Sequence, residues 1–386
     1  MQRREFLTVL AAGAAVGQTK VAGGRGKWFP SERRKYKDEV TGREVWQMTT
    51  HPGGSMNLYF TCQSFTKGNR GLVFTSGRTG RSELFLMEMA TGRLRQLTEA
   101  ETGIGYATVC QAANSICYAD NGGVWWLDIG TLKTRKIFSV PPGYGTDSLS
   151  VDDAGRYASF VYNKRLDKPI SPELTHDSHI VRVRTDGSGF DKVHDENFWV
   201  SHVLINPTDP DTILFCHEGG WSVVAQRMWT VDVKTKKLTK IRVEEKPEIA
   251  VGHEYWTEHG AAVGYHGSYL GRQWIGRIRK DGTGMREYTL TAPTGHSCAS
   301  EDGKHIVADG NPDFPYLSLV HPMGDIGVLE PICGRGKLTR TDPHAHAAFS
   351  ADGKWIVFCS ARHGEPNVYL IETPTRSAAG CMYYGT

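Results

Sequence analysis

Short apolar runs separated by polar turns recur along this 386-residue chain. Roughly 40 to 55 residues separate successive turns, which is the size of one propeller blade. Each turn is followed by a strand-like run, from LVFTS near the amino end to WIVFCS near the carboxyl end. A third run such as ELFLMEM often follows, and then a fourth such as TGRLRQLT. The reference turns lie at Thr66, Ala112, Ser150, Asn206, Thr257, Ser300 and Ser350.

Units of four strands, repeated seven times, predict an all-β fold: a seven-bladed β-propeller of four-stranded antiparallel blades. Length alone favours two or more domains. A closed ring of this blade size uses nearly the whole chain, however, so we expect one propeller domain over residues 26–386. The second and fifth units are weak, and a two-sheet β-sandwich with many hairpins stays open as the alternative.

The amino terminus has the pattern of an export signal. A twin-arginine sequence, RREFL, begins at Arg3, and an apolar stretch with small residues continues to Gly17. Within this stretch, from Leu7 to Gly17, there is no acidic residue and no polar face, which argues against a cytoplasmic amphipathic helix. We therefore predict a signal peptide and flexible leader over residues 1–25, and export to the periplasm by the twin-arginine route. No second apolar segment is long enough to span a membrane, so we expect no transmembrane segment in the mature protein.

Composition and charge narrow the classes of partner. With 44 glycines, 10% aromatic residues and a formal net charge of +3, the chain resembles a large soluble β protein. Basic and acidic residues are mixed along the whole chain, so no nucleic-acid partner is expected. Of the eight cysteines, Cys117, Cys216 and Cys359 lie inside apolar runs, where a thiol acts as a small hydrophobe. The other five leave one or two disulfides open.

Histidines occupy the same place in four successive repeats. His202, His253, His296 and His346 each stand four residues ahead of a reference turn. Because the first strand of every blade lines the central channel, these imidazoles are expected to converge at one rim. His344 is two residues before His346 and points the same way along a strand. The pattern predicts a site for a metal, an acid or a base, although a single histidine at a strand start is as often a structural residue.

Loops between second and third strands reach the same rim and add positive charge. They carry His217, Glu218, Arg227, Arg78, Arg362 and His363. Together with the four repeats they predict a basic, histidine-rich cup. The simpler alternative is that Glu218 and Glu254 orient imidazoles or pair with Arg227, and that Arg78 and Arg362 are ordinary loop charges.

Several segments, taken in order, resemble one known family. They are NLYFT near Asn57, ILFCHEGGW, QRMW, GHEYW, GHS and DPHAHAAFSADGKWIVF. In this combination they are similar to oligogalacturonate lyase of polysaccharide lyase family 22, and the resemblance runs from about Gly26 to the carboxyl end. The SADGK turn alone is common to many propellers, whereas CHEGGW, GHEYW and PHAHAAF are specific in combination.

The resemblance implies a role for each matching residue. It makes His296, His344 and His346 metal ligands, with Mn²⁺ as the expected ion and other divalent transition metals as alternatives. It makes His253 the Brønsted base, and Arg227 the group that stabilises charge on the substrate. The family's fourth ligand is a glutamine three residues before the HxH pair. Thr341 holds that place here, and its hydroxyl is a shorter and weaker donor.

Five further residues are predicted to contact the substrate. His202 has no role in the resemblance, but its repeat register places it near the metal ligands. His217 and Arg78 lie on loops at the same rim. Tyr255 and Trp256 could stack on sugar faces, although aromatic residues at strand starts more often act as wedges between blades.

These residue types suit β-elimination on a 4-linked uronide, with an oligogalacturonide or related pectin fragment as the substrate. The reaction removes the weakly acidic proton at C5 and expels the oxygen at C4. A divalent ion and Arg227 would neutralise the C6 carboxylate, and a neutral imidazole is a base of suitable strength. Three imidazoles favour Mn²⁺, Zn²⁺, Ni²⁺ or Fe²⁺ over Ca²⁺, which prefers oxygen ligands.

Competing functions make different demands on the sequence. A non-catalytic exported propeller that binds protein or saccharide does not need converging histidines. An oligopeptidase needs a G-x-S-x-G elbow, which GHSCA is not. A glycosidase needs paired carboxylates, and the obvious candidates, Asp147 and Asp309, are not in a common register. A lyase is therefore the preferred hypothesis. Oligomeric state, substrate length and methylation are left open by the sequence.

Overall fold

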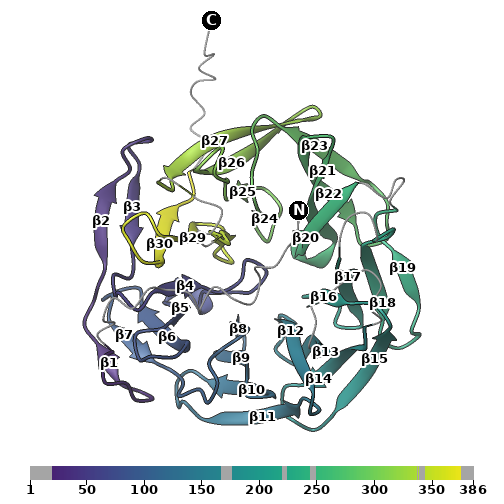
Figure 1. Cartoon of the computed structure of the whole chain (residues 1–386), viewed down its shortest axis with the longest axis horizontal. Helices are drawn as coiled ribbons and strands as arrows, with labels where there is room; N and C mark the ends of the chain where they lie inside the picture. The colour runs from purple at the N-terminus through teal and green to yellow at the C-terminus, as the bar shows by residue number, and fades with distance from the viewer. Residues whose placement is uncertain are drawn as a thin grey trace, which may run out of the picture.

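The computed structural model describes residues 20–166, 176–219, 224–243, 249–336, 338 and 344–374. The predicted signal peptide up to residue 19, Thr341, and the tail from residue 375 lie outside these residues. The described part is built of strands, with two short 3-10 turns at Lys67–Asn69 and Glu258–Gly260. Its sheets are arranged around a common axis, as in a β-propeller (Figure 1). The all-β prediction is confirmed.

Three of the sheets are regular four-stranded antiparallel units, in the chain order that was predicted. They consist of β8 (Ala107–Cys110), β9 (Ser115–Asp120), β10 (Gly123–Asp128) and β11 (Thr134–Ser139); of β12 (Tyr144–Val151), β13 (Tyr157–Lys164), β14 (Ser178–Arg184) and β15 (Phe190–Glu196); and of β16 (Val200–Ile205), β17 (Thr212–His217), β18 (Met228–Asp232) and β19 (Leu238–Lys240).

The first sheet has a fifth strand, which comes from the amino-terminal segment. Its order is β1 (Trp28–Phe29), β7 (Leu94–Gln96), β6 (Glu83–Glu88), β5 (Gly71–Ser76) and β4 (Ser55–Asn57). The predicted second-strand runs, such as LVFTS in β5 and ICYAD in β9, form strands as expected. The first strand in each group of four lies nearest the axis (Figure 1), so residues at its start can reach the centre.

One sheet departs from the predicted regularity because it holds eight strands. Its order is β20 (Ala250–Thr257), β21 (Ala262–Tyr269), β22 (Arg272–Arg279), β23 (Arg286–Leu290), β27 (Ile326–Gly334), β26 (Tyr316–Met323), β25 (Ile306–Ala308) and β24 (Ser297–Ala299). Only two residue pairs, both parallel, join β23 to β27. Two outer edges with unpaired backbone groups meet here and satisfy each other.

Local turn chemistry explains why the SADGK-type turn recurs. The Ser350 amide donates to the Trp355 carbonyl at 2.8 Å, and the Ser350 hydroxyl donates to Asp352 at 2.7 Å. Gly353 takes a left-handed φ of 69°, which a side chain would disfavour. Ser300 forms the same turn with Asp302. In the third sheet the equivalent amide is that of Asp152, which donates to Tyr157, so the expected reference at Ser150 is wrong by two residues.

The hairpin of β2 (Arg34–Lys37) and β3 (Glu44–Gln47) closes the ring. β3 pairs with β30 (Asn367–Glu372), which continues through β29 (Trp355–Ser360) to β28 (Ala348–Phe349). The segment that completes the last sheet in the described residues is thus β3. The sheets on either side of the closure share the largest apolar cluster, which includes Phe74, Phe85 and Phe358.

A buried ion pair fastens this closure. Asp38, whose side chain is fully buried, accepts hydrogen bonds from the Gly334 amide at 3.1 Å and from Arg362 Nη1 at 3.0 Å. Arg362 also donates to the Gly334 carbonyl at 2.6 Å. The Asp38 carboxylate therefore links the closing hairpin to β27 of the eight-stranded sheet and to the loop after β29 of its own sheet. Arg362 is thus a structural residue rather than an ordinary loop charge.

Two further expectations concern cysteines and membranes. The cysteines in the described residues, all except Cys381, are free and buried. Burial raises the pKa of Cys62 to about 12, which keeps that thiol neutral. Among the described residues, no helix has the length and apolar character needed to cross a bilayer.

Removing the cation of the buried closure pair should destabilise the protein strongly. Arg362→Ala leaves the Asp38 carboxylate buried without its partner, and we expect it to lower the free energy of unfolding by about 3 kcal/mol. Lys35→Ala breaks the exposed Lys35–Glu44 pair of the same hairpin and should cost less than about 1 kcal/mol. Urea unfolding measures both variants, and equal effects would contradict the role given to Asp38.

Candidate active site

A left-handed backbone residue sits at the same point in several inner strands. His202, His253 and His346 have φ of 49°, 55° and 45°, and Ser148 has 59°. In β12, β16 and β20 the pairing register shifts across this residue, which marks a β-bulge. Histidine tolerates this conformation better than most residues do. Bulges re-aim side chains, which explains how strands from separate sheets can present imidazoles to one place.

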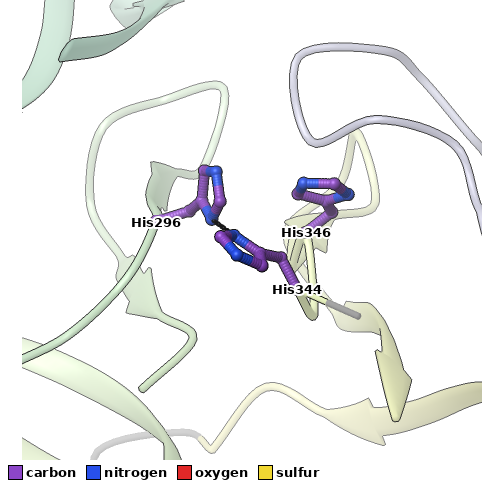
Figure 2. A group of neighbouring side chains, drawn as sticks. All are labelled: His296, His344 and His346. Atoms are coloured by element: carbon purple, nitrogen blue, oxygen red, sulfur yellow. Dashed lines mark hydrogen bonds between the residues drawn. The ribbon is translucent and has the colours of Figure 1, made fainter. Parts of the chain in front are cut away.

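Three of the predicted metal ligands lie together. His296, His344 and His346 each offer a ring nitrogen, and these nitrogens lie within 4.8 Å of one another (Figure 2). His296 precedes β24, whereas His344 and His346 precede β28. The His344 Nδ1 atom lies 3.2 Å from His296 Nδ1. We call these residues the three-histidine cluster.

Neighbouring groups orient the three-histidine cluster. Asp309 accepts a hydrogen bond from the His296 amide at 2.7 Å, and its other oxygen lies 3.2 Å from His296 Nδ1. Asn57 Nδ2 donates to the His346 carbonyl at 2.7 Å. A carboxylate on one ring nitrogen of a metal-binding histidine fixes the ring and leaves the other nitrogen as ligand. Asp309 is thus a supporting residue for His296 rather than half of a carboxylate pair.

The residues present fit a divalent transition metal. The Nε2 atoms of His296 and His346 are buried and have no hydrogen-bond partner among the described residues. Unpaired buried nitrogens are costly unless something compensates them. Burial lowers the pKa of His346 well below its ordinary value, and the nearby His296 and His344 lower it further, so the ring is held neutral as metal binding requires. Thr341, the expected fourth ligand, lies outside the described residues.

One aromatic ring, that of Phe60, packs among the histidines. The Phe60 side chain is buried, and its ring centroid lies 5.4 Å from that of His296, 6.0 Å from His253 and 6.3 Å from His346. A buried apolar ring at this place lowers the local dielectric constant, which strengthens the charge interactions of the neighbouring side chains.

The predicted base lies beside the three-histidine cluster. The His253 ring centroid is 4.0 Å from that of His296 and 5.6 Å from that of His202. Its Nδ1 atom lies 3.1 Å from Nε2 of His266 on β21. Gly252, the residue before His253, pairs with His266 across the two strands. The structure therefore brings His202, His253, His296, His344 and His346 together.

Arg227 is held by two carboxylates. Its Nε donates to Glu254 Oε1 at 2.6 Å, and its Nη2 donates to Glu218 Oε1 at 2.9 Å. All three side chains are largely buried. The pairing of Glu218 and Glu254 with Arg227, weighed as an alternative from the sequence, is the arrangement observed. The guanidinium charge is matched within the protein, whereas the resemblance implies that it faces the sugar.

Tyr59 links the first sheet to the histidines. Its hydroxyl lies 3.3 Å from His202 Nε2, and its ring centroid is 4.7 Å from that of His346. At the other edge of the His202 imidazole, Nδ1 lies 3.5 Å from Glu254 Oε2. The contact between Tyr59 and His202 spans 143 positions in the chain, so no local pattern predicts it.

Two predicted substrate contacts take part in internal pairs instead. Arg78 is buried, donates to Glu32 at 2.6 Å and lies over the Phe85 ring at 4.9 Å. His217 Nε2 lies 3.3 Å from Glu196 Oε1, and its ring stacks on Phe198. Both contacts give the side chain a structural role, and their substrate roles stay predictions.

The two aromatic candidates occupy packing positions. Tyr255 is 5% exposed and belongs to the largest apolar cluster, where Gly264 leaves space for its ring. Trp256 packs against the apolar cluster between β16 and β20, and its indole donates to the Leu204 carbonyl at 3.0 Å. These are the wedge positions that the sequence offered as the alternative, and stacking on sugar stays a prediction.

The sequence missed several residues that build the site. Tyr59 and Phe60 lie in the NLYFT segment, which was noted only for its resemblance. His266 carries no signal beyond being a histidine in a second strand. Asp147, considered only as a glycosidase carboxylate, accepts hydrogen bonds from the Tyr106 hydroxyl at 3.0 Å and from the Ser148 hydroxyl at 3.3 Å. Burial raises the pKa of Asp147 to about 6, and the charge of Glu218 also raises it.

Known proteins resemble the chain in sequence. The model of a protein family described as oligogalacturonate lyase matches residues 23–316, a range that ends before His344. An oligogalacturonate lyase of Dickeya dadantii (strain 3937) is 25% identical over 386 residues, covering 91% of this chain and 98% of that protein. An oligogalacturonide lyase of Pectobacterium atrosepticum is 24% identical over 384 residues, also covering 91% of this chain and 98% of that protein.

Solved structures resemble the chain in fold. An oligogalacturonate lyase in complex with manganese superposes with a TM-score of 0.81 at 23% identity, and the match covers 91% of this chain and 99% of that one. An oligogalacturonate lyase from Vibrio parahaemolyticus gives the same TM-score of 0.81 at 20% identity, with the same coverage. These likenesses support the propeller architecture.

The free energy of unfolding should depend on pH through Asp147, which lies on β12. Its pKa of about 6 lies above the ordinary value of 3.8, so its contribution to stability is present at low pH and is lost as the pH rises toward 6. Asp147→Asn removes the titration. Between about pH 5 and about pH 7.5, the unfolding free energy of the wild type should fall by about 1 kcal/mol relative to the variant. Urea unfolding at both pH values checks this, and a difference that grows with pH would contradict it.

Proposed function

The chain belongs to the oligogalacturonate lyase family, and on that premise we propose that it cleaves short 4-linked galacturonides by metal-dependent β-elimination. The observation that carries the proposal is the approach of His253 to the three-histidine cluster, with ring centroids of His253 and His296 4.0 Å apart. A base and a metal site at this separation can act on adjacent atoms of one sugar, the C5 proton and the C6 carboxylate.

The chemistry requires the acidity of C5 to be raised. When bound, a divalent ion neutralises the C6 carboxylate and stabilises the negative charge that develops at C5. The side chains proposed to hold it are those of His296, His344 and His346. Its expected identity is Mn²⁺, because imidazole nitrogens suit that ion and because a fold relative was solved with manganese. Asp309 keeps His296 in a fixed orientation.

His253 is proposed to take the C5 proton. Its Nδ1 lies 3.1 Å from His266 Nε2, so we propose Nε2 as the nitrogen that takes the proton. A neutral imidazole is a base of suitable strength for this step.

Arg227 is proposed to stabilise charge on the substrate. Glu218 and Glu254 hold the guanidinium rigidly beside His202. A substrate carboxylate would have to compete with Glu218 for the Nη atoms, and such a bidentate pair is among the stronger charge-assisted interactions. We also keep His202, His217, Arg78, Tyr255 and Trp256 as proposed substrate contacts, and Thr341 as a proposed ligand.

We infer that the eight-stranded sheet is two blades. The groups β20–β23 and β24–β27 are each antiparallel and consecutive in the chain, and only two residue pairs join them. Counted in this way, the ring has seven blades and forms one domain over residues 26–386.

We propose that the protein is exported by the twin-arginine route. The motif at Arg3 supports this proposal, and so does the need of a metalloenzyme to acquire its ion while folded. A binding propeller without catalytic activity is the less favoured function, because such a protein does not need a histidine base beside the three-histidine cluster.

Purified protein with Mn²⁺ and digalacturonate should generate a product that absorbs in the ultraviolet, because elimination creates a C4=C5 bond conjugated with the carboxylate. The same reaction without added metal, after treatment with a chelator, should be slower by at least about 100-fold. Release of saturated galacturonate instead would identify a hydrolase and contradict the proposal.

Two alanine variants separate the base from the ligands. His253→Ala should lower kcat by about 1,000-fold or more, because the C5 proton has no acceptor, while metal bound per chain is unchanged. His344→Ala should lose both metal and turnover. Elemental analysis beside the ultraviolet assay measures both quantities, and equal loss of metal in the two variants would contradict the assigned roles.

A further inference from the structure

Elimination from a galacturonide needs a proton donor that the proposed function does not yet supply. The leaving sugar oxygen departs with the electron pair of the C4–O4 bond, and a poor alkoxide leaving group is helped by protonation. In the chair form of a galacturonide, H5 and O4 are both axial and project from opposite faces of the ring. A donor must therefore approach from the side opposite the base.

Tyr59 lies in the appropriate place for such a donor. His253 enters the cup from β20, whereas Tyr59 follows β4 in the first sheet. Both rings flank the same two histidines: Tyr59 lies 5.8 Å from His202 and 6.5 Å from His296, while His253 lies 5.6 Å and 4.0 Å from them, between ring centroids. The base and the tyrosine thus approach a common space from different sheets.

A hydrogen-bonded partner prepares Tyr59 for proton transfer. The Tyr59 hydroxyl lies 3.3 Å from His202 Nε2. His202 Nδ1 faces Glu254 Oε2 at 3.5 Å, and the Glu254 carboxylate is itself anchored by Arg227. The Nδ1 atom has no hydrogen-bond partner among the described residues, which suits the tautomer with the proton on Nε2. In that tautomer His202 donates to the Tyr59 oxygen, so the phenol hydrogen can point at the substrate.

We propose that Tyr59 is the catalytic residue that protonates the departing O4, and that His202 is the positioning residue that holds it. The inference rests on the proposed lyase function and adds the acid that this function lacks. It also gives His202, which has no role in the resemblance, a reason for its place in the ring.

The proton count of the step balances. His253 takes H5, the electrons of the C5–H bond form the C4=C5 bond, and the C4–O4 bond breaks with its pair on oxygen. The Tyr59 hydroxyl gives its proton to O4. After the products leave, His253 gives its proton to water and Tyr59 takes one back from water. No oxidant, reductant or further reactant is consumed.

The test deletes only the hydroxyl and varies the leaving group. Tyr59→Phe keeps the ring that packs on His346, so bound metal should be unchanged. With digalacturonate and Mn²⁺, kcat should fall by about 100-fold or more with little change in KM. With a galacturonate that carries 4-nitrophenol at O4, whose anion leaves without a proton, the loss should be less than about 5-fold by the same reasoning. His202→Ala should show the same dependence on the leaving group with a smaller loss.

A matched control removes a hydroxyl elsewhere. Tyr157 begins β13, where Arg182 lies over its ring at 4.3 Å, and Tyr157→Phe should keep the wild-type rate on both substrates. Equal losses on both substrates in Tyr59→Phe would show a role in positioning and overturn the proposal, and so would a rate within about 3-fold of wild type on digalacturonate. Either result leaves the lyase function intact, whereas a wild-type protein that forms no unsaturated product removes both.

Discussion

The site depends on a backbone conformation that the inner strands adopt at the mouth of the ring. At His202, His253 and His346 the chain turns left-handed, with φ between 45° and 55°. In β16 and β20, the pairing register shifts at this residue. An ordinary strand residue at these places would keep its side chain in the alternation of the pleat. The bulge breaks that alternation, so residues on separate sheets, distant in sequence, can meet above Phe60.

The charged side chains of the cup fall into two separate groups. On one side stands the three-histidine cluster, with Asp309 behind His296 and with the pKa of His346 held well below its ordinary value by burial. On the other, Arg227 is matched by Glu218 and Glu254. Between them stand His253 and His202, with ring centroids 5.6 Å apart. A dry, preorganised site of this kind gives its electrostatic groups more effect than they would have in water.

What could be predicted from the sequence was local or periodic. The strand runs and the Ser350 turn follow from patterns within ten residues, and the histidine register follows from the repeat. Other features depend on contacts between distant residues. The pairing of β23 with β27 involves only two residue pairs, Tyr59 reaches His202 across 143 positions, and Arg227 meets its second carboxylate from another sheet. The Ser150 reference failed because the turn there is formed by Asp152, two residues after the serine.

The central claim is that His296, His344 and His346 hold a divalent ion beside His253. Anomalous scattering from a crystal grown with Mn²⁺, recorded on either side of the manganese absorption edge, tests it most directly. The account predicts one strong peak bonded to nitrogens of all three histidines, and its disappearance in His344→Ala. A fully active crystal form with the peak elsewhere, or with a peak that survives that substitution unchanged, would contradict it.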